Sequence, residues 1–252
     1  LSDFIILKDG SPTLGLVIIF CIGTFLMRSA GCVINDFFDR DFDGKVERTK
    51  NRPLVTGQVK GFEAITLFFI LVSLSASLLF WTNKLTVIIA CIGLIIAVIY
   101  PLTKRFFELP QVFLGLAFSW GILMVSAAEL DKISSTSLIM FSACFFWIMA
   151  YDTAYAMSDR VDDLSIGLKS SAITFGKYSQ KLIITFHLIS LCLWSFSGFL
   201  EKINPIFYVS IIVCLVLVFF QFLLIRDENP EKCFTAFKRN NWIGISILLG
   251  TI

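Results

Sequence analysis

The chain has 252 residues, of which 57% are hydrophobic and only 16% are charged, and its net charge at pH 7 is +2. A soluble domain carries about 25% charged residues, so this composition excludes a single soluble core and predicts a protein that crosses a membrane several times. The lipid bilayer is therefore the expected surrounding, and no nucleic-acid partner is expected.

Eight stretches of the chain are long and apolar enough to cross a bilayer, which takes roughly 20 residues per helix. They run over 12–34, 62–81, 84–101, 110–128, 136–157, 181–200, 205–225 and 239–252. The last stretch is cut short by the end of the chain, and the start has neither an initiator Met nor a signal-peptide pattern. We expect one transmembrane domain over 1–252 that lacks its first helix and its C-terminal end.

Basic residues alternate between the predicted loops. Most of them lie in the loops 35–61, 102–109, 158–181 and 226–239, whereas the intervening loops hold only Lys84, Lys132 and Lys202. Because cytoplasmic loops carry an excess of Lys and Arg, these four basic loops are predicted to face the cytoplasm.

Acidic residues gather where the first predicted span ends. Asn35, Asp39 and Asp43 are spaced i, i+4, i+8, and Asp36 and Asp43 are seven residues apart. On a helix these residues form one stripe. Asp41 points away from this stripe, and we expect it to be solvated.

A second acidic cluster follows the fifth predicted span. Asp159 and Asp163 are four residues apart and share a helix face. The two clusters are four crossings apart, so they return to the same side of the membrane.

Crowded carboxylates repel one another, by about 3 kcal/mol for a pair ~5 Å apart at an effective dielectric near 20. Bound cations would relieve this repulsion, and Asp and Asn oxygens without His or Cys suit Mg²⁺, which shares its shell with water and substrate phosphates. Two clusters on one face therefore predict two metal sites with a diphosphate between them. The alternative is a solvated acidic loop, which is disfavoured because acids at a helix C-terminus oppose the helix dipole.

Two ionisable residues lie deeper in the predicted spans. Arg28 is seven residues before Asn35, and Asp152, with Tyr151 beside it, is seven before Asp159. Charges within a membrane are costly and are usually functional, so Arg28 is expected either to bind an anionic substrate group or to pair with Asp152. Lys104, Arg105 and Lys169 in the basic loops are candidates for neutralising diphosphate oxygens. These candidate substrate-binding residues are Arg28, Lys104, Arg105, Tyr151, Asp152 and Lys169.

The two acidic stretches resemble the paired motifs of the UbiA superfamily of intramembrane aromatic prenyltransferases. Asn35 to Asp43 matches N-D-x-x-D-x-x-x-D, and Asp159 to Asp163 matches D-x-x-x-D. Leu109-Pro110-Gln111-Val112 and Tyr100-Pro101 are similar to the 4-hydroxybenzoate polyprenyltransferase branch. The resemblance implies an all-α bundle of nine transmembrane helices around a central cavity open to the cytoplasmic side, of which eight are visible in this chain.

The resemblance also implies a reaction and a set of residue roles. Asn35, Asp36, Asp39 and Asp43 would hold one Mg²⁺, and Asp159 and Asp163 a second, with Asp39, Asp43, Asp159 and Asp163 as the catalytic carboxylates. A polyprenyl group would pass from polyprenyl diphosphate to the ring of 4-hydroxybenzoate in ubiquinone synthesis, at the cytoplasmic face of a bacterial inner membrane.

Three alternatives remain open from the sequence. The acceptor could be a naphthoate, homogentisate, haem or chlorophyllide in place of 4-hydroxybenzoate. A CDP-alcohol phosphotransferase also uses clustered Asp, but its longer signature is absent. An ion-coupled transporter would place its acids near the membrane midplane, whereas these lie at helix ends.

Overall fold

The computed structural model describes residues 2–7 and 12–252, and in these residues the regular structure is entirely helical. The long helices are α2 (Leu14–Asp43), α3 (Gly61–Leu78), α4 (Lys84–Thr103), α5 (Pro110–Leu130), α6 (Ser135–Ile166), α8 (Ser179–Leu200) and α9 (Ile206–Ile225). The shorter elements are α1 (Ser2–Leu7), η1 (Leu79–Trp81), α7 (Ser171–Phe175), η2 (Gly176–Tyr178), α10 (Pro230–Arg239) and α11 (Asn241–Thr251). The predicted all-α bundle is confirmed.

Seven segments of the described chain are long and apolar enough to cross a membrane. The predicted span over 239–252 is not among them, because α11 has 11 residues and measures only about 16 Å. An eighth span therefore stays a prediction. Two of the observed helices run past their predicted ends, α2 from 34 to 43 and α6 from 157 to 166. The acidic residues of both clusters therefore lie on helices and not in loops.

Local signals in the sequence explain where several helices begin and end. The Asn83 side chain accepts a hydrogen bond from the backbone N–H of Thr86 at 2.9 Å, and Ser134 accepts one from Ser137 at 3.0 Å, which caps α4 and α6. α6 ends at Ile166, and it is followed by Gly167, whose φ of 75° lies in the left-handed region that glycine adopts without strain. This turn directs the chain from the second acidic cluster into α7.

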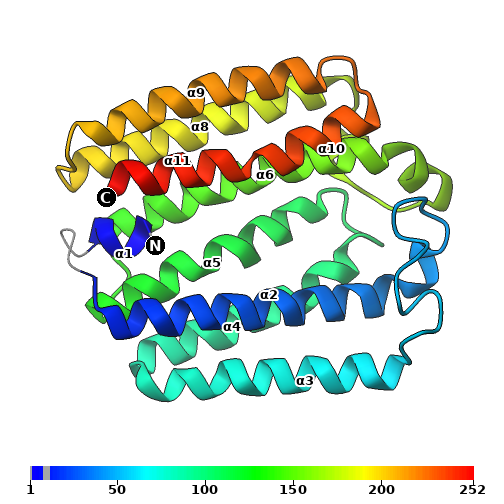
Figure 1. The fold of residues 1–252 in the computed structure, drawn as a ribbon, viewed down its shortest axis with the longest axis horizontal. Helices are drawn as coiled ribbons and strands as arrows, with labels where there is room; N and C mark the ends of the chain where they lie inside the picture. Colours follow the sequence, from blue (N-terminus) through cyan, green and yellow to red (C-terminus); the bar gives the residue numbers. More distant parts are fainter. Residues whose placement is uncertain (1, 8–11) are drawn as a thin grey trace.

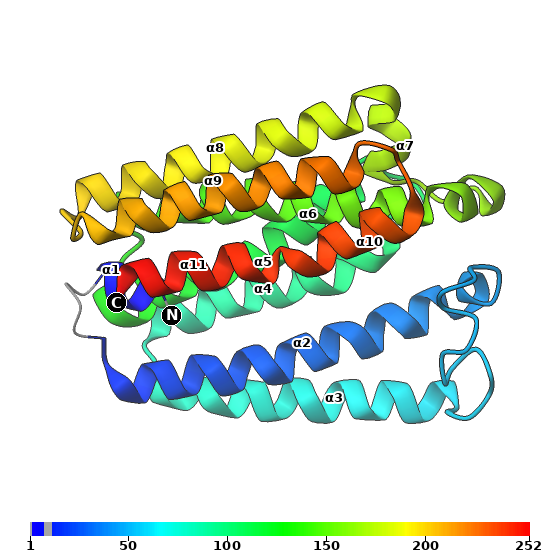
Figure 2. The ribbon, with the colours of Figure 1, turned by 45° about the horizontal axis from the view of Figure 1, so that its top comes forward.

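The helices run roughly side by side, with α4 and α5 between the α2–α3 pair and the group made of α6, α8 and α9 (Figures 1 and 2). α6 packs against α5, α8 and α10, and α11 packs against α9. α2 packs mainly against α3, and many of its residues line the cavity described below.

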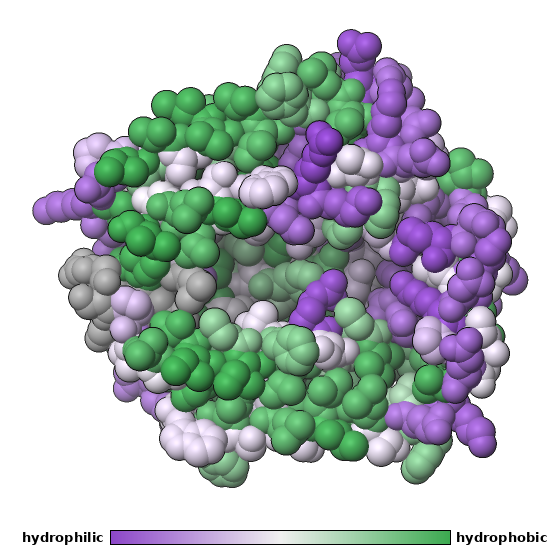
Figure 3. All heavy atoms as spheres, viewed as in Figure 1, coloured by the Kyte–Doolittle hydropathy of each residue, from purple (hydrophilic) through white to green (hydrophobic). Residues whose placement is uncertain are grey.

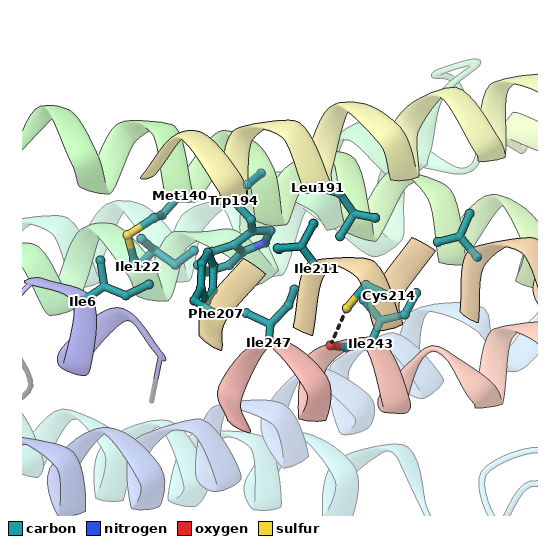
Figure 4. Close-up of a cluster of buried hydrophobic side chains, with 12 residues drawn as sticks. Ile6, Ile122, Met140, Leu191, Trp194, Phe207, Ile211, Cys214, Ile243 and Ile247 are labelled. Atoms are coloured by element: carbon teal, nitrogen blue, oxygen red, sulfur yellow. Dashed lines mark hydrogen bonds between the residues drawn. The ribbon is translucent and has the colours of Figure 1, made fainter. Parts of the chain in front are cut away.

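The largest buried apolar cluster lies between α6, α8, α9 and α11 (Figure 4). Trp194 and Phe207 are both buried there, and Phe207 packs on Gly198, where an added Cβ would lie 2.7 Å from the Phe207 ring. Glycine at this position therefore lets α8 and α9 approach closely. α6 thus contributes both to this cluster and to the cavity described below.

On the face drawn in Figure 3, the surface is largely apolar along the helices and hydrophilic at the end where the α2–α3 loop lies. Large exposed side chains such as Phe25, Phe69, Val209 and Phe219 cover the helices. The chain is an integral, multi-pass membrane protein. The basic loops meet at the hydrophilic end, where Lys169 donates its backbone N–H to the carbonyl of Lys104 at 3.0 Å and Arg160 pairs with Glu228 at 3.2 Å.

Candidate active site

A cavity of about 1040 Å³ lies inside the bundle between α2, α3, α4, α5 and α6, with α10 beside its polar end. The face drawn in Figure 3 is hollowed between α2 and the α10–α11 segment, with α5 behind. Eleven of the twelve residues predicted for the site line this cavity, and the exception is Arg105.

All six predicted metal-binding residues border the cavity: Asn35, Asp36, Asp39 and Asp43 on α2, and Asp159 and Asp163 on α6. The two acidic clusters, which were predicted to lie on the same side of the membrane, therefore border one cavity, and their role as metal ligands stays a prediction. Asp41 lies outside the cavity lining, and 74% of its side chain is exposed. The expectation that Asp41 is solvated is confirmed.

Basic side chains pair with the carboxylates of the α2 cluster. Arg52 Nη1 lies 2.6 Å from Asp43 Oδ2 and 2.8 Å from Asp36 Oδ1. Lys104 Nζ lies 2.9 Å from Asp39 Oδ2 and 3.5 Å from Asn35 Oδ1. The repulsion expected among these acids is therefore relieved in this structure by cations from the chain itself.

Arg48, in the loop after α2, forms the corresponding ion pair with a carboxylate on α6. Its Nη2 lies 2.7 Å from Asp159 Oδ2, it also donates to the Tyr155 hydroxyl, and its guanidinium lies 4.7 Å from the centroid of the Tyr155 ring. Burial alone would lower the pKa of Arg48, but the hydrogen bond to Asp159 and the nearby negative charges raise it above its usual range. The loop after α2 thus extends to the second acidic cluster, where its Arg48 side chain remains positively charged.

The donor atoms around the cavity fit Mg²⁺ by their chemistry, because carboxylate and amide oxygens are the protein ligands it takes. Within residues 2–7 and 12–252, no three His, Cys, Asp or Glu side chains converge on a point that could hold a metal ion. Mg²⁺ usually binds one or two carboxylates and completes its shell with water and substrate phosphates.

The deeper candidates line the cavity but do not pair with each other. Arg28 Nη1 donates to Cys32 Sγ at 3.4 Å, and its guanidinium lies 5.0 Å from the Phe118 ring centroid. Asp152 is buried, and none of the described ion pairs joins it to Arg28. The expected ion pair between Arg28 and Asp152 is not among those of the described residues, and binding of an anionic group by Arg28 stays a prediction.

The predicted loop residues separate into two groups. Lys104 and Lys169 line the cavity, and Lys169 Nζ donates to the carbonyl of Phe106 at 3.2 Å. Arg105 instead donates to the carbonyl of Phe38 at 2.6 Å and lies over the Phe42 ring, 5.3 Å from its centroid. Arg105 therefore holds the end of α2, and the structure does not bring it together with the other candidates.

An aromatic wall of four residues, Tyr151, Tyr155, Phe234 and Phe237, was not predicted as a unit. Phe237 on α10 lies with its ring centroid 4.9 Å from that of Tyr155 and 5.8 Å from that of Tyr151. Phe234 stacks on Phe237 at 6.0 Å, and all four rings line the cavity. The i, i+3 spacing of Phe234 and Phe237 behind Pro230 is the sequence signal that could have identified α10 as a cavity wall.

The chain matches the UbiA prenyltransferase family over residues 2–243. It is 47% identical to a 4-hydroxybenzoate octaprenyltransferase of Psychromonas ingrahamii over 97% of this chain and 85% of that protein. It is 43% identical to the protein of the same name from Nitrosospira multiformis, over 97% of this chain and 84% of that protein.

Solved structures share the fold. A UbiA homologue from Aeropyrum pernix K1 superposes with a TM-score of 0.85 at 24% identity, covering 100% of this chain and 95% of that one. A UbiA homologue from Archaeoglobus fulgidus bound to GPP and Mg²⁺ superposes with a TM-score of 0.72 at 20% identity, covering 94% of this chain and 87% of that one. With its family match, its relatives and its fold in agreement, this chain belongs to the UbiA prenyltransferase family and is a prenyltransferase.

Proposed function

We propose that the chain transfers a polyprenyl group from polyprenyl diphosphate to the ring of 4-hydroxybenzoate, in an Mg²⁺-dependent step of ubiquinone synthesis. One observation carries the proposal: the carboxylates of α2 and α6 and the cations Arg48, Arg52 and Lys104 line one cavity whose remainder is largely apolar. The names of the relatives and the GPP and Mg²⁺ in the A. fulgidus homologue support the same function.

The carboxylates of the two helices would hold the metal. In this proposal Asn35, Asp36, Asp39 and Asp43 bind one Mg²⁺ and Asp159 and Asp163 a second, with the donor's diphosphate between them. When bound, Mg²⁺ supplies positive charge that stabilises the departing diphosphate. Arg48, Arg52 and Lys104, which pair with these carboxylates in the structure, would bind diphosphate oxygens, which guanidinium and ammonium groups recognise well.

The reaction breaks one bond and forms another. The allylic C–O bond of the donor breaks, and its electron pair leaves with the diphosphate. The ring carbon ortho to the hydroxyl of 4-hydroxybenzoate forms the new C–C bond, and loss of the ring proton restores aromaticity. The residues of the cavity stabilise the charge as it develops, and the apolar walls exclude the water that would otherwise consume the allylic cation.

Arg28 is the proposed contact for the carboxylate of the acceptor. It lies 5.0 Å from the Phe118 ring, lines the cavity and is seven residues before Asn35 on the same helix, which places it about 10 Å deeper than the metal site. A guanidinium can bind a carboxylate with two parallel hydrogen bonds. The acceptor ring would then lie between Arg28 and the aromatic wall.

An acceptor screen tests this function. Membranes that contain the chain are supplied with Mg²⁺, octaprenyl diphosphate and one acceptor at a time: 4-hydroxybenzoate, a dihydroxynaphthoate, homogentisate, haem or chlorophyllide. We expect a prenylated product with 4-hydroxybenzoate and little with the others. A clear preference for another acceptor would replace this substrate, and no product with any acceptor would contradict the proposed reaction.

We also propose that the protein lies in a bacterial inner membrane with the polar end of the cavity facing the cytoplasm. The basic loops that meet at this end support that orientation. In a variant with all seven native Cys replaced, a maleimide that does not cross membranes should label Lys132→Cys but not Lys45→Cys in spheroplasts. The reverse labelling pattern would overturn the orientation.

A further inference from the structure

One side chain in the turn between α9 and α10, that of Glu228, connects this turn to two other helices. Its Oε2 accepts a hydrogen bond from Arg160 Nη1 on α6 at 3.2 Å, and its Oε1 accepts one from Gln180 Nε2 on α8 at 3.2 Å. Gln180 Nε2 also donates to the backbone carbonyl of Arg226 at 3.0 Å. The two oxygens of one carboxylate therefore join α6 and α8 to the segment from which α10 begins.

The backbone of Glu228 has a conformation that residues with a side chain seldom adopt. Its φ is 52°, in the left-handed region, which is unfavourable for a residue that carries a Cβ. Such a conformation persists where the surrounding contacts determine it. The hydrogen bonds with Arg160 and Gln180 are contacts of this kind, and the backbone N–H of Glu228 also donates to the carbonyl of Ile225 at 3.1 Å. These contacts stabilise one shape of the turn.

α10 begins directly after this turn and forms one wall of the cavity. The Asn229 side chain caps α10 by accepting a hydrogen bond from the backbone N–H of Lys232 at 3.1 Å. Phe234 and Phe237 line the cavity, and the Phe237 ring lies 4.9 Å from that of Tyr155 on α6. Phe237 is eight positions after Asn229, or about 12 Å along the helix. A change in the turn would therefore be transmitted to the aromatic wall through two helical turns.

We propose that Glu228 is a positioning residue, which keeps α10 and the rings of Phe234 and Phe237 against α6 during prenyl transfer. Its partner Arg160 directly follows Asp159, so Glu228 joins α10 to the part of α6 that carries the second acidic cluster. The turn lies at the end of the molecule where α6 ends and α8 begins (Figures 1 and 2). This inference rests on the proposed function, because the wall is assigned a role in that reaction.

Displacement of α10 has a chemical consequence that can be measured. After the allylic C–O bond to the diphosphate has broken, the allylic carbon can form its new bond with the ring of 4-hydroxybenzoate or with the oxygen of water. In the second case the water loses a proton and the product is a free prenol. A cavity whose wall has moved away from α6 admits more water, so the ratio of prenylated 4-hydroxybenzoate to prenol reports on the position of α10.

Asp227, the neighbouring acid in the same turn, provides a matched control. It pairs with Lys232 at 2.8 Å and with Arg226 at 3.6 Å, and both of these partners belong to the α9–α10 segment. Asp227→Gly therefore removes an equal charge and adds an equal freedom to the backbone without removing a contact to α6 or α8. Glu228→Gly removes both contacts, but glycine adopts the backbone conformation of this position without strain, so the variant should fold.

The product ratio is measured for the parent chain, Glu228→Gly, Glu228→Gln and Asp227→Gly after the same extent of donor consumption, with membrane content measured by immunoblot. We expect the ratio to fall about two- to fivefold in Glu228→Gly, the population change that a partly exposed ion pair supports. Glu228→Gln, which keeps one acceptor oxygen, should lie between Glu228→Gly and the parent, and Asp227→Gly should keep the parent ratio. An unchanged ratio in Glu228→Gly, or an equal fall in Asp227→Gly, overturns the positioning role.

A double variant tests whether Glu228 acts through the aromatic wall. If it does, Glu228→Gly should lower the product ratio little further in a chain that already carries Phe237→Leu, because the effects of coupled residues are not additive. Independent effects that multiply in the double variant would overturn this route. A general packing defect lowers the rate of forming both products and leaves their ratio unchanged.

A distance measurement needs no turnover and separates this inference from the proposed function. In a variant with all seven native Cys replaced, nitroxide labels are attached to Val161→Cys on α6 and Glu231→Cys on α10, both at exposed positions. Electron paramagnetic resonance should give a broader distribution of distances between the labels in Glu228→Gly than in the parent or in Asp227→Gly. The same distribution in all three overturns the positioning role. Absence of prenyl transfer by the parent chain contradicts the proposed function instead.

Discussion

Arg48 and Asp159 join the two acid-bearing helices across the polar end of the cavity. The Arg48 guanidinium donates to both oxygens of the Asp159 carboxylate, at 2.7 Å from Nη2 and 3.3 Å from Nε. Arg48 belongs to the loop after α2, and Asp159 lies on α6, so this pair ties the first cluster to the second. Because Asp159 is a proposed metal ligand, the same guanidinium is already in place to bind a diphosphate oxygen when the carboxylate turns to the metal.

We predict that Arg48→Gln lowers kcat/KM for the donor about 10- to 100-fold, because a hydrogen bond to a charged group contributes about 1.5–3 kcal/mol. Initial rates over a range of donor concentrations measure this effect. Lys50→Gln is the matched control, since Lys50 is in the same loop and pairs with Glu47 in an exposed ion pair that contributes little. Equal losses in the two variants would mean that the loop acts only through its overall charge.

We predict that substitution of Lys104 impairs donor binding, whereas substitution of the adjacent Arg105 has little effect on it. Lys104 pairs with Asp39 at 2.9 Å. Burial alone would lower its pKa, but Tyr100 and Asp39 raise it above its usual range, so this ammonium stays charged at neutral pH. Lys104→Gln should therefore raise the KM for the donor and lower kcat/KM about tenfold or more. Arg105→Gln should change the donor KM little, because Arg105 binds the carbonyl of Phe38 outside the cavity. An effect of Arg105→Gln on the donor KM larger than that of Lys104→Gln would indicate that Arg105 contacts the substrate.

Asp39→Asn and Asp159→Asn are each predicted to lower the rate of prenyl transfer about a hundredfold or more. Losses of this size are typical when an enzyme loses one group that stabilises charge in the transition state. Asp41→Asn is the control, because it removes the same charge from the same helix at an exposed position outside the cavity. Membrane content of each variant is measured by immunoblot alongside the rate. Full turnover in both Asp39→Asn and Asp159→Asn would contradict the metal-binding role.

The main features of the site could be predicted because they depend on spacing along a helix. Asn35, Asp39 and Asp43 share a face in any α-helix, and the two clusters reach one side of the membrane in any even number of crossings. The same reasoning could not find Arg48 and Arg52. Lys and Arg are common in cytoplasmic loops for topological reasons, so their sequence pattern does not separate a residue that reaches a carboxylate from one that faces water.

Other features depend on tertiary contacts that one sequence does not contain. Lys104 and Arg105 are adjacent, yet the end of α4 turns one toward Asp39 and the other toward the backbone of Phe38. The aromatic wall needs α10 to pack on α6, which Cys233 and Ala236 achieve by being buried against it. The last predicted span begins at residue 239, close to the junction of α10 and α11. That prediction did not identify α10 as a wall of the cavity.

Metal removal is predicted to stop transfer and Mg²⁺ to restore it. The described residues offer oxygen ligands to the metal but no group of three acidic, Cys or His side chains converging on one point. Because the donor's phosphates would supply the rest of the shell, binding of metal and donor should be mutually dependent. Equilibrium binding of labelled farnesyl diphosphate, measured with EDTA and with excess Mg²⁺, should show tight binding only with the metal. Equal binding in both conditions would contradict metal-assisted recognition of the diphosphate.

Phe237 is predicted to protect the allylic cation from water. Its ring lies 4.9 Å from that of Tyr155 and stacks on Phe234, and the three rings form part of the aromatic face that lines the cavity. Cations are attracted to such faces by about 0.5–2 kcal/mol, which Phe237→Leu would remove while keeping an apolar side chain. We expect the ratio of prenylated 4-hydroxybenzoate to free prenol to fall severalfold in Phe237→Leu and to be kept in Phe237→Tyr.

The product ratio distinguishes this role from simple packing, since a packing defect lowers both products together. Phe219→Leu is the control, because Phe219 is an exposed ring on α9 that does not line the cavity. Both products are separated and quantified by chromatography after the same extent of donor consumption. If Phe237→Leu gives the product ratio of the parent chain, α10 closes the cavity without stabilising the cation, and the remaining rings, Tyr151 and Tyr155, become the next residues to test.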